Sequence, residues 1–223
     1  MIYFDNVTKV YPGNDLALEN ITLSIDDGEF VSVVGHSGAG KTTMVRLILG
    51  EVHPTSGNLS FESQDISDMD SSQVSLLRRR IGTVFQDFKL LPNKTAYENI
   101  AFAMEVAGRS DEDVAADVPH VLDLVNLSQK RDRFPRELSG GERQRLSIAR
   151  AIVNQPDVII ADEPTGNLDP EATYEIIQIL QKINELGTTV ILTTHSQGVV
   201  DSLKKRVIRL EEGRIISDTK ASK

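Results

Sequence analysis

The stretch GHSGAGKTT, residues 35–43, constrains the fold of this chain more than any other segment. It matches G-x-x-x-x-G-K-[ST], follows the β-branched run FVSVV and precedes a segment with helical spacing. Glycines in such a loop let backbone N–H groups turn toward one centre, and the following helix adds its positive N-terminal end. The stretch therefore predicts a phosphate-binding loop between a strand and a helix.

Other apolar runs predict the rest of a mostly parallel sheet. They are short, they are bounded by turn residues, and helical patterns separate them, which is typical of strands covered on both faces. The runs are GEFVSVVG, RIGTVFQ, DVIIADEP and TTVILTTH. A helix is expected after Asp169, with Pro170 at its first position and Gly187 just past its end. Its core stripe comprises Ile176, Ile177, Leu180 and Ile183.

The middle of the chain has helical spacing from about residue 94 to residue 153, as in VPHVLDLVNL and GERQRLSIARAIVN. This block lies between two predicted strands and is too long for a simple crossover. We therefore expect one domain over residues 1–223, with a helical subdomain at 94–153 inserted into an α/β core formed by 1–93 and 154–223.

Composition excludes several classes of protein. The net charge is −9, from 33 acidic and 24 basic residues, which does not favour nucleic-acid binding. We expect the basic runs at 78–80 and 204–206 to be solvated faces or charges at helix ends. The chain has no cysteine, so disulfides and thiolate metal sites are excluded. It lacks a signal-peptide pattern and any apolar stretch near 18 residues, so we expect a cytosolic chain without its own membrane span.

The residues at the ends of the predicted strands indicate phosphoryl transfer. Lys41 supplies a charge for the β- and γ-phosphates of a nucleotide, and Thr42 supplies a hydroxyl for Mg²⁺. Asp162 and Glu163 end the strand VIIA at the same edge of the sheet, because strand ends meet there in a parallel sheet. We expect Asp162 to face the metal and Glu163 to act as general base toward an attacking water.

Gln86 and His195 end two further strands, after IGTVF and VILTT. Each alone is more often structural than catalytic. Together with the phosphate loop and the two carboxylates they describe one catalytic site, in which Lys41 also takes part.

Five segments in this order resemble the nucleotide-binding subunit of ATP-binding-cassette (ABC) transporters: GHSGAGKT, VFQD, LSGGERQ, VIIADEPTGNLD and TTH. The resemblance covers essentially the whole chain. It implies a P-loop NTPase of the α/β class with a mostly parallel sheet core, an N-terminal antiparallel β subdomain and an inserted helical subdomain. It also implies that Gln86 bridges the metal and the attacking water, and that His195 bonds a γ-phosphate oxygen and holds Glu163.

In that family the LSGGE segment caps the γ-phosphate held by a second subunit, which implies a two-fold dimer with two ATP molecules. Ser139 and Glu142 have capping-box spacing, which a plain helix start also explains. The glycine pair Gly140 and Gly141 is not explained that way, and we expect it to open backbone donors to a phosphate. Tyr11 is expected to stack on adenine, although core packing is an alternative. The full expected set for ATP is Tyr11, Gly35, His36, Ser37, Gly38, Ala39, Gly40, Lys41, Thr42, Thr43, Ser139, Gly140, Gly141 and Glu142; the set for Mg²⁺ is Thr42, Gln86 and Asp162.

The segment DEPTGNLD resembles a subgroup whose ATPases drive lipoprotein extraction, macrolide efflux and cell-division complexes. Residues 84–108 most resemble the cell-division branch, which implies an integral membrane partner and a peripheral place on the cytoplasmic face of the bacterial membrane. Two alternatives stay open: the ATPase of a lipoprotein or macrolide/peptide exporter, and an ATP-gated assembly module in which hydrolysis only resets the state.

A docking surface for the partner is predicted just after Gln86. Apolar residues cluster there around a loop that contains Pro92, so the nucleotide state could reach them. The cluster comprises Phe88, Leu90, Leu91, Phe102 and Met104, and we expect the first three to form the groove. A core of the helical block is the alternative interpretation.

Overall fold

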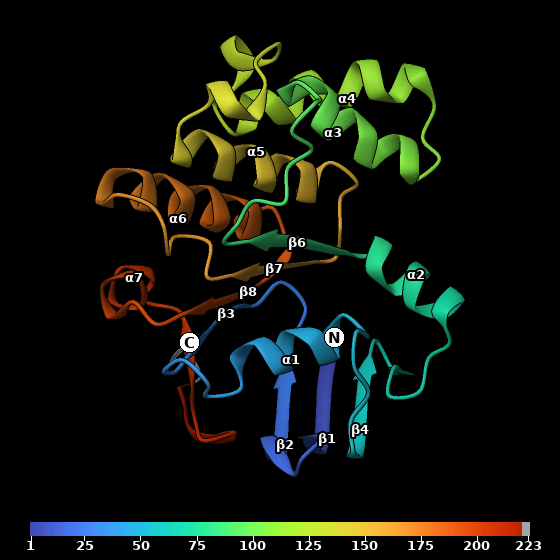
Figure 1. Cartoon of the computed structure of the whole chain (residues 1–223), viewed down its shortest axis with the longest axis vertical. Coiled ribbons are helices and arrows are strands. Elements are labelled where there is room, and N and C mark those ends of the chain that lie inside the picture. Colours follow the sequence, from blue (N-terminus) through green and yellow to red (C-terminus); the bar gives the residue numbers. More distant parts are fainter. Residues whose placement is uncertain (220–223) are drawn as a thin grey trace.

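A central sheet of six strands organises the chain, which is described over residues 1–219 by a computed structural model (Figure 1). The strand order is β10-β9-β3-β8-β7-β6, with β10 antiparallel to β9 and all other pairs parallel. The strands are β3 (Phe30–Val34), β6 (Ile81–Phe85), β7 (Val158–Asp162), β8 (Thr189–Thr194), β9 (Arg206–Glu211) and β10 (Arg214–Thr219). The predicted parallel sheet is confirmed; the expected core range also included 220–223, which lie outside the described residues.

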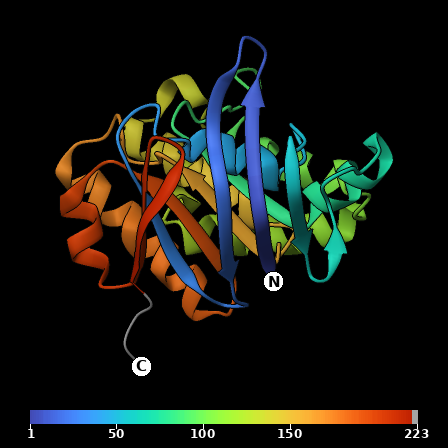
Figure 2. The same ribbon diagram turned by 90° about the horizontal axis from the view of Figure 1, so that it is seen from below.

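A second, antiparallel sheet has the order β2-β1-β4-β5 and crosses one side of the molecule (Figure 2). Its strands are β1 (Ile2–Tyr11), β2 (Asp15–Ile25), β4 (Ser56–Phe61) and β5 (Gln64–Asp65). Helix α1 (Lys41–Ile48) lies between this sheet and the central one (Figure 1). The antiparallel sheet, α1 and one face of the central sheet share a hydrophobic core.

The other helices complete the chain. They are α2 (Ser71–Arg79), α3 (Ala96–Val106), α4 (Asp111–Leu124), α5 (Gly140–Ile152), α6 (Pro170–Glu185) and α7 (Gln197–Leu203), with 3-10 turns at Ser128–Lys130 and Pro135–Glu137. Helices α3, α4, α5 and α6 lie on the side of the central sheet opposite α1 (Figure 1). Their apolar faces share a second core with that face of the sheet. In residues 1–219, no helix has both the length and the apolar character needed to cross a membrane.

The strands of the central sheet supply both cores because successive side chains point to opposite faces. In β7, Val158 and Ile160 belong to the core with α1, whereas Ile159 and Ala161 belong to the core with α3–α6. This two-sided burial explains why the strands read as continuous apolar runs rather than as alternating ones.

Helices α2 to α6 start with side-chain caps. Asp169 accepts a hydrogen bond from the N–H of Ala172 at 2.8 Å, Pro170 opens α6, and Gly187 takes φ +104° after its end, as the sequence predicted. Capping boxes also start α2, α3, α4 and α5. Such caps satisfy backbone N–H groups that have no partner within the helix.

Arg206 corrects the expectation that the run at 204–206 is a solvated face. Its side chain is 2% exposed and is held on β9 by Asp218 at 2.6 Å and Glu29 at 3.0 Å. It also donates to the carbonyl of Ser24 at 2.8 Å. The hydrogen bonds that Arg206 donates to Asp218 and to Glu29 raise its pKa above the ordinary value, against the effect of burial. The guanidinium therefore joins two strands of the central sheet, β9 and β10, to the β2–β3 connection.

Arg206→Met should lower the free energy of unfolding by about 2 kcal/mol, because two partly buried carboxylates lose their counter-charge. Chemical denaturation followed by circular dichroism measures this. Arg209→Met, on the same strand but exposed and without an ion pair in the described residues, is the matched control. Equal stability of the two variants would contradict a structural role for the Arg206 cluster.

Candidate functional site: a phosphate loop facing two carboxylates

The predicted phosphate loop connects β3 to α1. Gly40 takes φ +107° as the residue before α1, and Gly38 takes φ +80°, conformations that favour glycine. The Lys41 side chain is 6% exposed, and its Nζ donates to the carbonyls of Gly35 at 2.7 Å and His36 at 3.1 Å. The lysine charge is thus held inside the loop, where a phosphate would be bound.

A cavity of about 630 Å³ opens beside this loop. Thr42, Gln86, Asp162 and Glu163 all line it, so the structure brings together the predicted metal and base residues. They come from α1 and from the carboxyl ends of β6 and β7. This is where ligands bind in open parallel sheets.

Thr193 fixes the two carboxylate residues. It pairs with Asp162 across the parallel strands β7 and β8, and its Oγ1 donates to Asp162 Oδ1 at 2.5 Å. The N–H of Glu163 donates to the Oγ1 and to the carbonyl of Thr193, both at 3.1 Å. Glu163 takes φ +50°, a conformation uncommon outside glycine. These bonds stabilise the backbone turn at Glu163, directly after β7.

The carboxylate of Glu163 lies between two nitrogen groups. Its Oε2 is 2.5 Å from His195 Nδ1, and its Oε1 is 3.4 Å from Lys41 Nζ. The histidine therefore fixes the direction of the carboxylate, while the lysine brings it next to the phosphate loop. A carboxylate held in this way can accept a proton from a water placed between it and the phosphate.

The oxygen groups in the cavity fit Mg²⁺. The hydroxyl of Thr42, the amide of Gln86 and the carboxylate of Asp162 are hard donors, which this ion prefers. In residues 1–219, no cluster of three or more histidine, aspartate or glutamate side chains could hold a metal by itself. Mg²⁺ commonly uses one or two carboxylates together with substrate phosphates and water. The cavity therefore suits the ion as part of a nucleotide complex.

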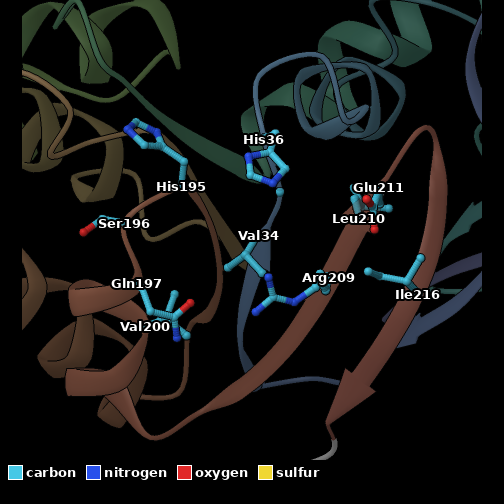
Figure 3. Close-up of a pocket in the computed structure, with 11 residues that line it drawn as sticks. Val34, His36, His195, Ser196, Gln197, Val200, Arg209, Leu210, Glu211 and Ile216 are labelled. Atoms are coloured by element: carbon cyan, nitrogen blue, oxygen red, sulfur yellow. The ribbon is translucent and has the colours of Figure 1, made fainter.

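His36 lies beside a second cavity, of about 190 Å³. Figure 3 shows His36 and His195 on two loops at one end of this cavity, with Arg209 extending from β9 toward Val34. The His36 imidazole thus lines a different space from Thr42 and Asp162. The backbone carbonyl of His36 accepts a hydrogen bond from Lys41.

Tyr11 ends β1 and is half-buried. Its hydroxyl accepts a hydrogen bond from Arg46 at 3.5 Å, and the Arg46 guanidinium lies 5.9 Å from the ring centre. Arg46 also lines the cavity with Thr42. The structure thus connects Tyr11 to the site through one side chain of α1, and stacking on adenine stays a prediction.

The LSGGE segment, residues 138–142, is called the signature segment from here on, and it forms the start of α5. Ser139 and Glu142 form a capping box, with the serine N–H 2.8 Å from Glu142 Oε2 and the glutamate N–H 3.2 Å from Ser139 Oγ. The hydrogen bond from the Ser139 backbone lowers the pKa of Glu142. No residue of 139–142 lines the cavity that holds Thr42, and α5 and α1 lie on opposite sides of the central sheet (Figure 1). One chain alone therefore does not join the two motifs.

The two glycines of the signature have different surroundings. A Cβ on Gly140 would meet only Leu168, at 3.4 Å, so this position is open to a ligand. A Cβ on Gly141 would lie 2.9 Å from Ala172 Cβ on α6. Close packing of α5 on α6 therefore requires Gly141. The role of both glycines toward a phosphate stays a prediction.

The predicted docking residues do not form one surface. Met104 is fully buried in the core, and Leu90 packs partly against it. Phe88 lies under the guanidinium of Arg143, 5.3 Å from the ring centre. Of the three residues expected to form the groove, Leu91 alone lines a cavity of about 370 Å³, together with Phe102.

Three residues that sequence reasoning missed contribute to the site: Thr193, Arg46 and Asn167. Asn167 lines the cavity and accepts a hydrogen bond from Gln86 Nε2 at 3.3 Å. Its position in GNLD, shortly after Asp162 and Glu163 in the sequence, was the feature that could have indicated a role in the site. Thr193 and Arg46 belong to a buried strand and a helix, where their types alone carry no functional signal.

The predicted ABC-type ATPase is confirmed by comparison with known proteins. A profile of the family described as ABC transporter matches residues 18–166. The chain therefore belongs to the ABC transporter family, as its ATP-binding subunit.

Individual relatives indicate a narrower group within this family. The chain is 50% identical over 218 residues to the cell division ATP-binding protein FtsE of Bacillus subtilis (strain 168), covering 98% of this chain and 96% of that one. It is 41% identical over 215 residues to FtsE of Escherichia coli (strain K12), covering 96% and 97%. Among solved structures it is similar to a dimeric bacterial ABC transporter cassette, MJ0796, with a TM-score of 0.90, 38% identity and full coverage of both chains. A structure of that cassette bound to ADP and Pi gives a TM-score of 0.89 at 37% identity, again with full coverage of both chains.

Proposed function

We propose that this chain acts in bacterial cell division, where it dimerises on ATP and transmits the ATP cycle through an FtsX-like integral membrane protein to control cell-wall hydrolysis. The observation that carries this proposal is the 50% identity to a cell division ATP-binding protein over 98% of the chain. In this account the protein lies on the cytoplasmic face of the membrane at the division site. It contacts the membrane through its partner and binds no nucleic acid.

The proposed reaction is Mg²⁺-dependent hydrolysis of ATP to ADP and phosphate. Lys41 holds the β- and γ-phosphates inside the loop, as its bonds to two loop carbonyls suggest. Thr42, Gln86 and Asp162 hold the metal, which would neutralise charge on the phosphates. Glu163 orients the water and accepts its proton, and the 2.5 Å contact with His195 supports this role for the carboxylate.

Each site is proposed to use two copies of the chain. The phosphate loop and the signature segment lie on different sides of one chain, and the start of α5 can bind an anion. A two-fold dimer places the signature of each copy over the phosphate loop of the other. The structural relative named above, a dimeric cassette, supports this arrangement.

The partner is proposed to dock in the 370 Å³ groove between the core at 1–93 and 154–223 and the helical subdomain at 94–153. Phe102 is 39% exposed there and Val106 62%, and Arg78 and Arg79 also line the groove. Apolar contacts flanked by arginines fit a cytoplasmic segment of the membrane protein with apolar and acidic side chains.

Arg150 connects the groove to the loop that follows Gln86, so a change at the nucleotide site could be transmitted to the partner. It lines the groove, and its guanidinium donates to the carbonyls of Lys89 at 2.6 Å and Phe88 at 3.1 Å. Burial lowers the pKa of Arg150. Phe88 and Lys89 come shortly after Gln86 in the sequence. A movement of Gln86 would therefore be transmitted through their carbonyls and Arg150 to α5, which lines the groove.

Val106→Asp should reduce recovery of the membrane partner by about 10-fold or more while ATP turnover of the isolated chain stays unchanged, because a charge replaces apolar contact area. Quantitative mass spectrometry after affinity purification from membranes measures recovery. Leu186→Asp, on a side chain 72% exposed at the end of α6, is the matched control. Unchanged recovery with Val106→Asp would exclude this groove as the docking site.

The function itself is tested by purifying the tagged Glu163→Gln chain with ATP and Mg²⁺ from native membranes and identifying the proteins recovered. A small integral membrane protein together with division proteins is the expected result. Recovery of an exporter subunit would assign the chain to lipoprotein, macrolide or peptide export instead. Absence of any membrane protein would overturn both assignments.

A further inference from the structure

The amide of Gln86 rests on the turn that follows Glu163. Its Nε2 donates to Asn167 Oδ1 at 3.3 Å. A Cβ on Gly166 would lie 2.8 Å from that Nε2 and 3.1 Å from the Gln86 amide carbon. A side chain at residue 166 would therefore make the end of the Gln86 side chain shift from this position.

The hydrogen bond to Asn167 uses the nitrogen end of the Gln86 amide. Asn167 takes the nitrogen end of Gln86, and within residues 1–219 no group donates a hydrogen bond to the Gln86 amide oxygen. The oxygen is the end of an amide that can bind Mg²⁺, because the NH₂ group has no lone pair to offer. Asn167 thus leaves the metal-binding end of Gln86 free in the cavity that also contains Asp162.

The turn also connects Gln86 to the general base. The N–H of Gly166 donates to the carbonyl of Glu163 at 3.2 Å, and the N–H of Leu168 donates to the carbonyl of Thr165 at 3.2 Å. Leu168 packs against the core shared with α6. The turn at residues 166–167, which contacts the Gln86 amide, is therefore stabilised by a hydrogen bond to the backbone of Glu163.

We propose that Gly166 and Asn167 are positioning residues that hold the amide oxygen of Gln86 toward the magnesium ion of the bound nucleotide. This rests on the proposed role of Gln86 as a metal ligand. Gly166 and Asn167 would orient a metal ligand without binding the metal. Substitution of residues with this role commonly lowers metal affinity by about 10- to 100-fold.

Asn167→Ala and Gly166→Ala test the support in two independent ways. The first removes the acceptor, and the second adds a methyl group where the Gln86 amide lies. Gly166 does not have a left-handed φ, so alanine fits its backbone. Gly198→Ala is the matched control, because its Cβ would meet nothing within 4 Å and its φ is likewise not left-handed.

The readout is binding of a fluorescent ATP analogue to the full chain carrying Glu163→Gln, with Mg²⁺ and with EDTA. The gain in affinity that Mg²⁺ provides should fall by about 10-fold in Asn167→Ala and Gly166→Ala, as for other supports of metal ligands. Affinity in EDTA should stay within about 2-fold, since the phosphate loop is untouched. Gly198→Ala should keep the full gain.

Combination with Gln86→Ala separates positioning from general damage. If the pair acts through Gln86, neither substitution lowers the Mg²⁺-dependent gain further once Gln86 is alanine. A full additional loss in that background, or an unchanged gain in both single variants, overturns the proposal. If the parent Glu163→Gln chain gains no affinity from Mg²⁺, the proposed metal site itself fails, which is a distinct result.

Discussion

Glu163→Gln should lower steady-state ATP turnover by about 10²- to 10⁴-fold, the range that loss of a general base typically costs. Glutamine has nearly the same shape and can keep the contact with His195, but its amide cannot take up a proton. Phosphate release measures turnover, and a fluorescent ATP analogue measures binding. Binding should persist because Lys41 and the loop are unchanged.

Glu185→Gln provides the control, because it makes the same change at an exposed position on α6 and should leave turnover unaltered. Turnover of Glu163→Gln within about 3-fold of the unmodified chain would contradict the general-base role. The same variant separates a motor from an ATP-gated assembly module. Full division in cells that carry only Glu163→Gln would show that hydrolysis is not the useful step.

Gly140→Asp should abolish ATP turnover, by about 100-fold or more, without loss of stability. The position is open, since a Cβ there would meet only Leu168 at 3.4 Å. A carboxylate in the first turn of α5 favours the helix by about 0.3–1 kcal/mol. The same charge would repel the phosphate that the signature of one copy is proposed to bind in the other, and loss of a donor to such a charge commonly costs 10²- to 10³-fold.

The comparison needs two measurements on the same variants. Thermal unfolding should show Gly140→Asp at least as stable as the unmodified chain, while phosphate release falls. Gly140→Ala is the control for the loss of glycine and should keep most of the turnover, since it brings no charge. Normal turnover in Gly140→Asp would mean that the signature segment does not approach a phosphate.

Local patterns predicted the parts of the site that depend on neighbours in sequence. The phosphate loop follows from GHSGAGKT between a strand and a helix, and the α6 boundaries follow from Asp169, Pro170 and Gly187. Strand ends also locate Gln86, Asp162 and His195 at one edge, because the carboxyl ends of parallel strands meet there. The prediction of the antiparallel sheet rested on the family resemblance rather than on these patterns.

Features that depend on tertiary neighbours were not predictable in this way. Thr193 and Asn167 gain their roles only when β8 and the turn after β7 are placed beside Asp162 and Gln86. Gly141 is required by Ala172 on another helix. Arg206, in a run of basic residues, is buried because Glu29, far away in the sequence, and Asp218, on the neighbouring strand, pair with it.

We propose that ATP joins two copies of this chain, each completing the site of the other. Light scattering after size-exclusion chromatography of the Glu163→Gln chain tests it most directly. The molar mass should double with ATP and Mg²⁺ but not with ADP, and adding Gly140→Asp should prevent the doubling. A monomer at saturating ATP, or a dimer that forms equally well with Gly140→Asp, would contradict the shared-site arrangement.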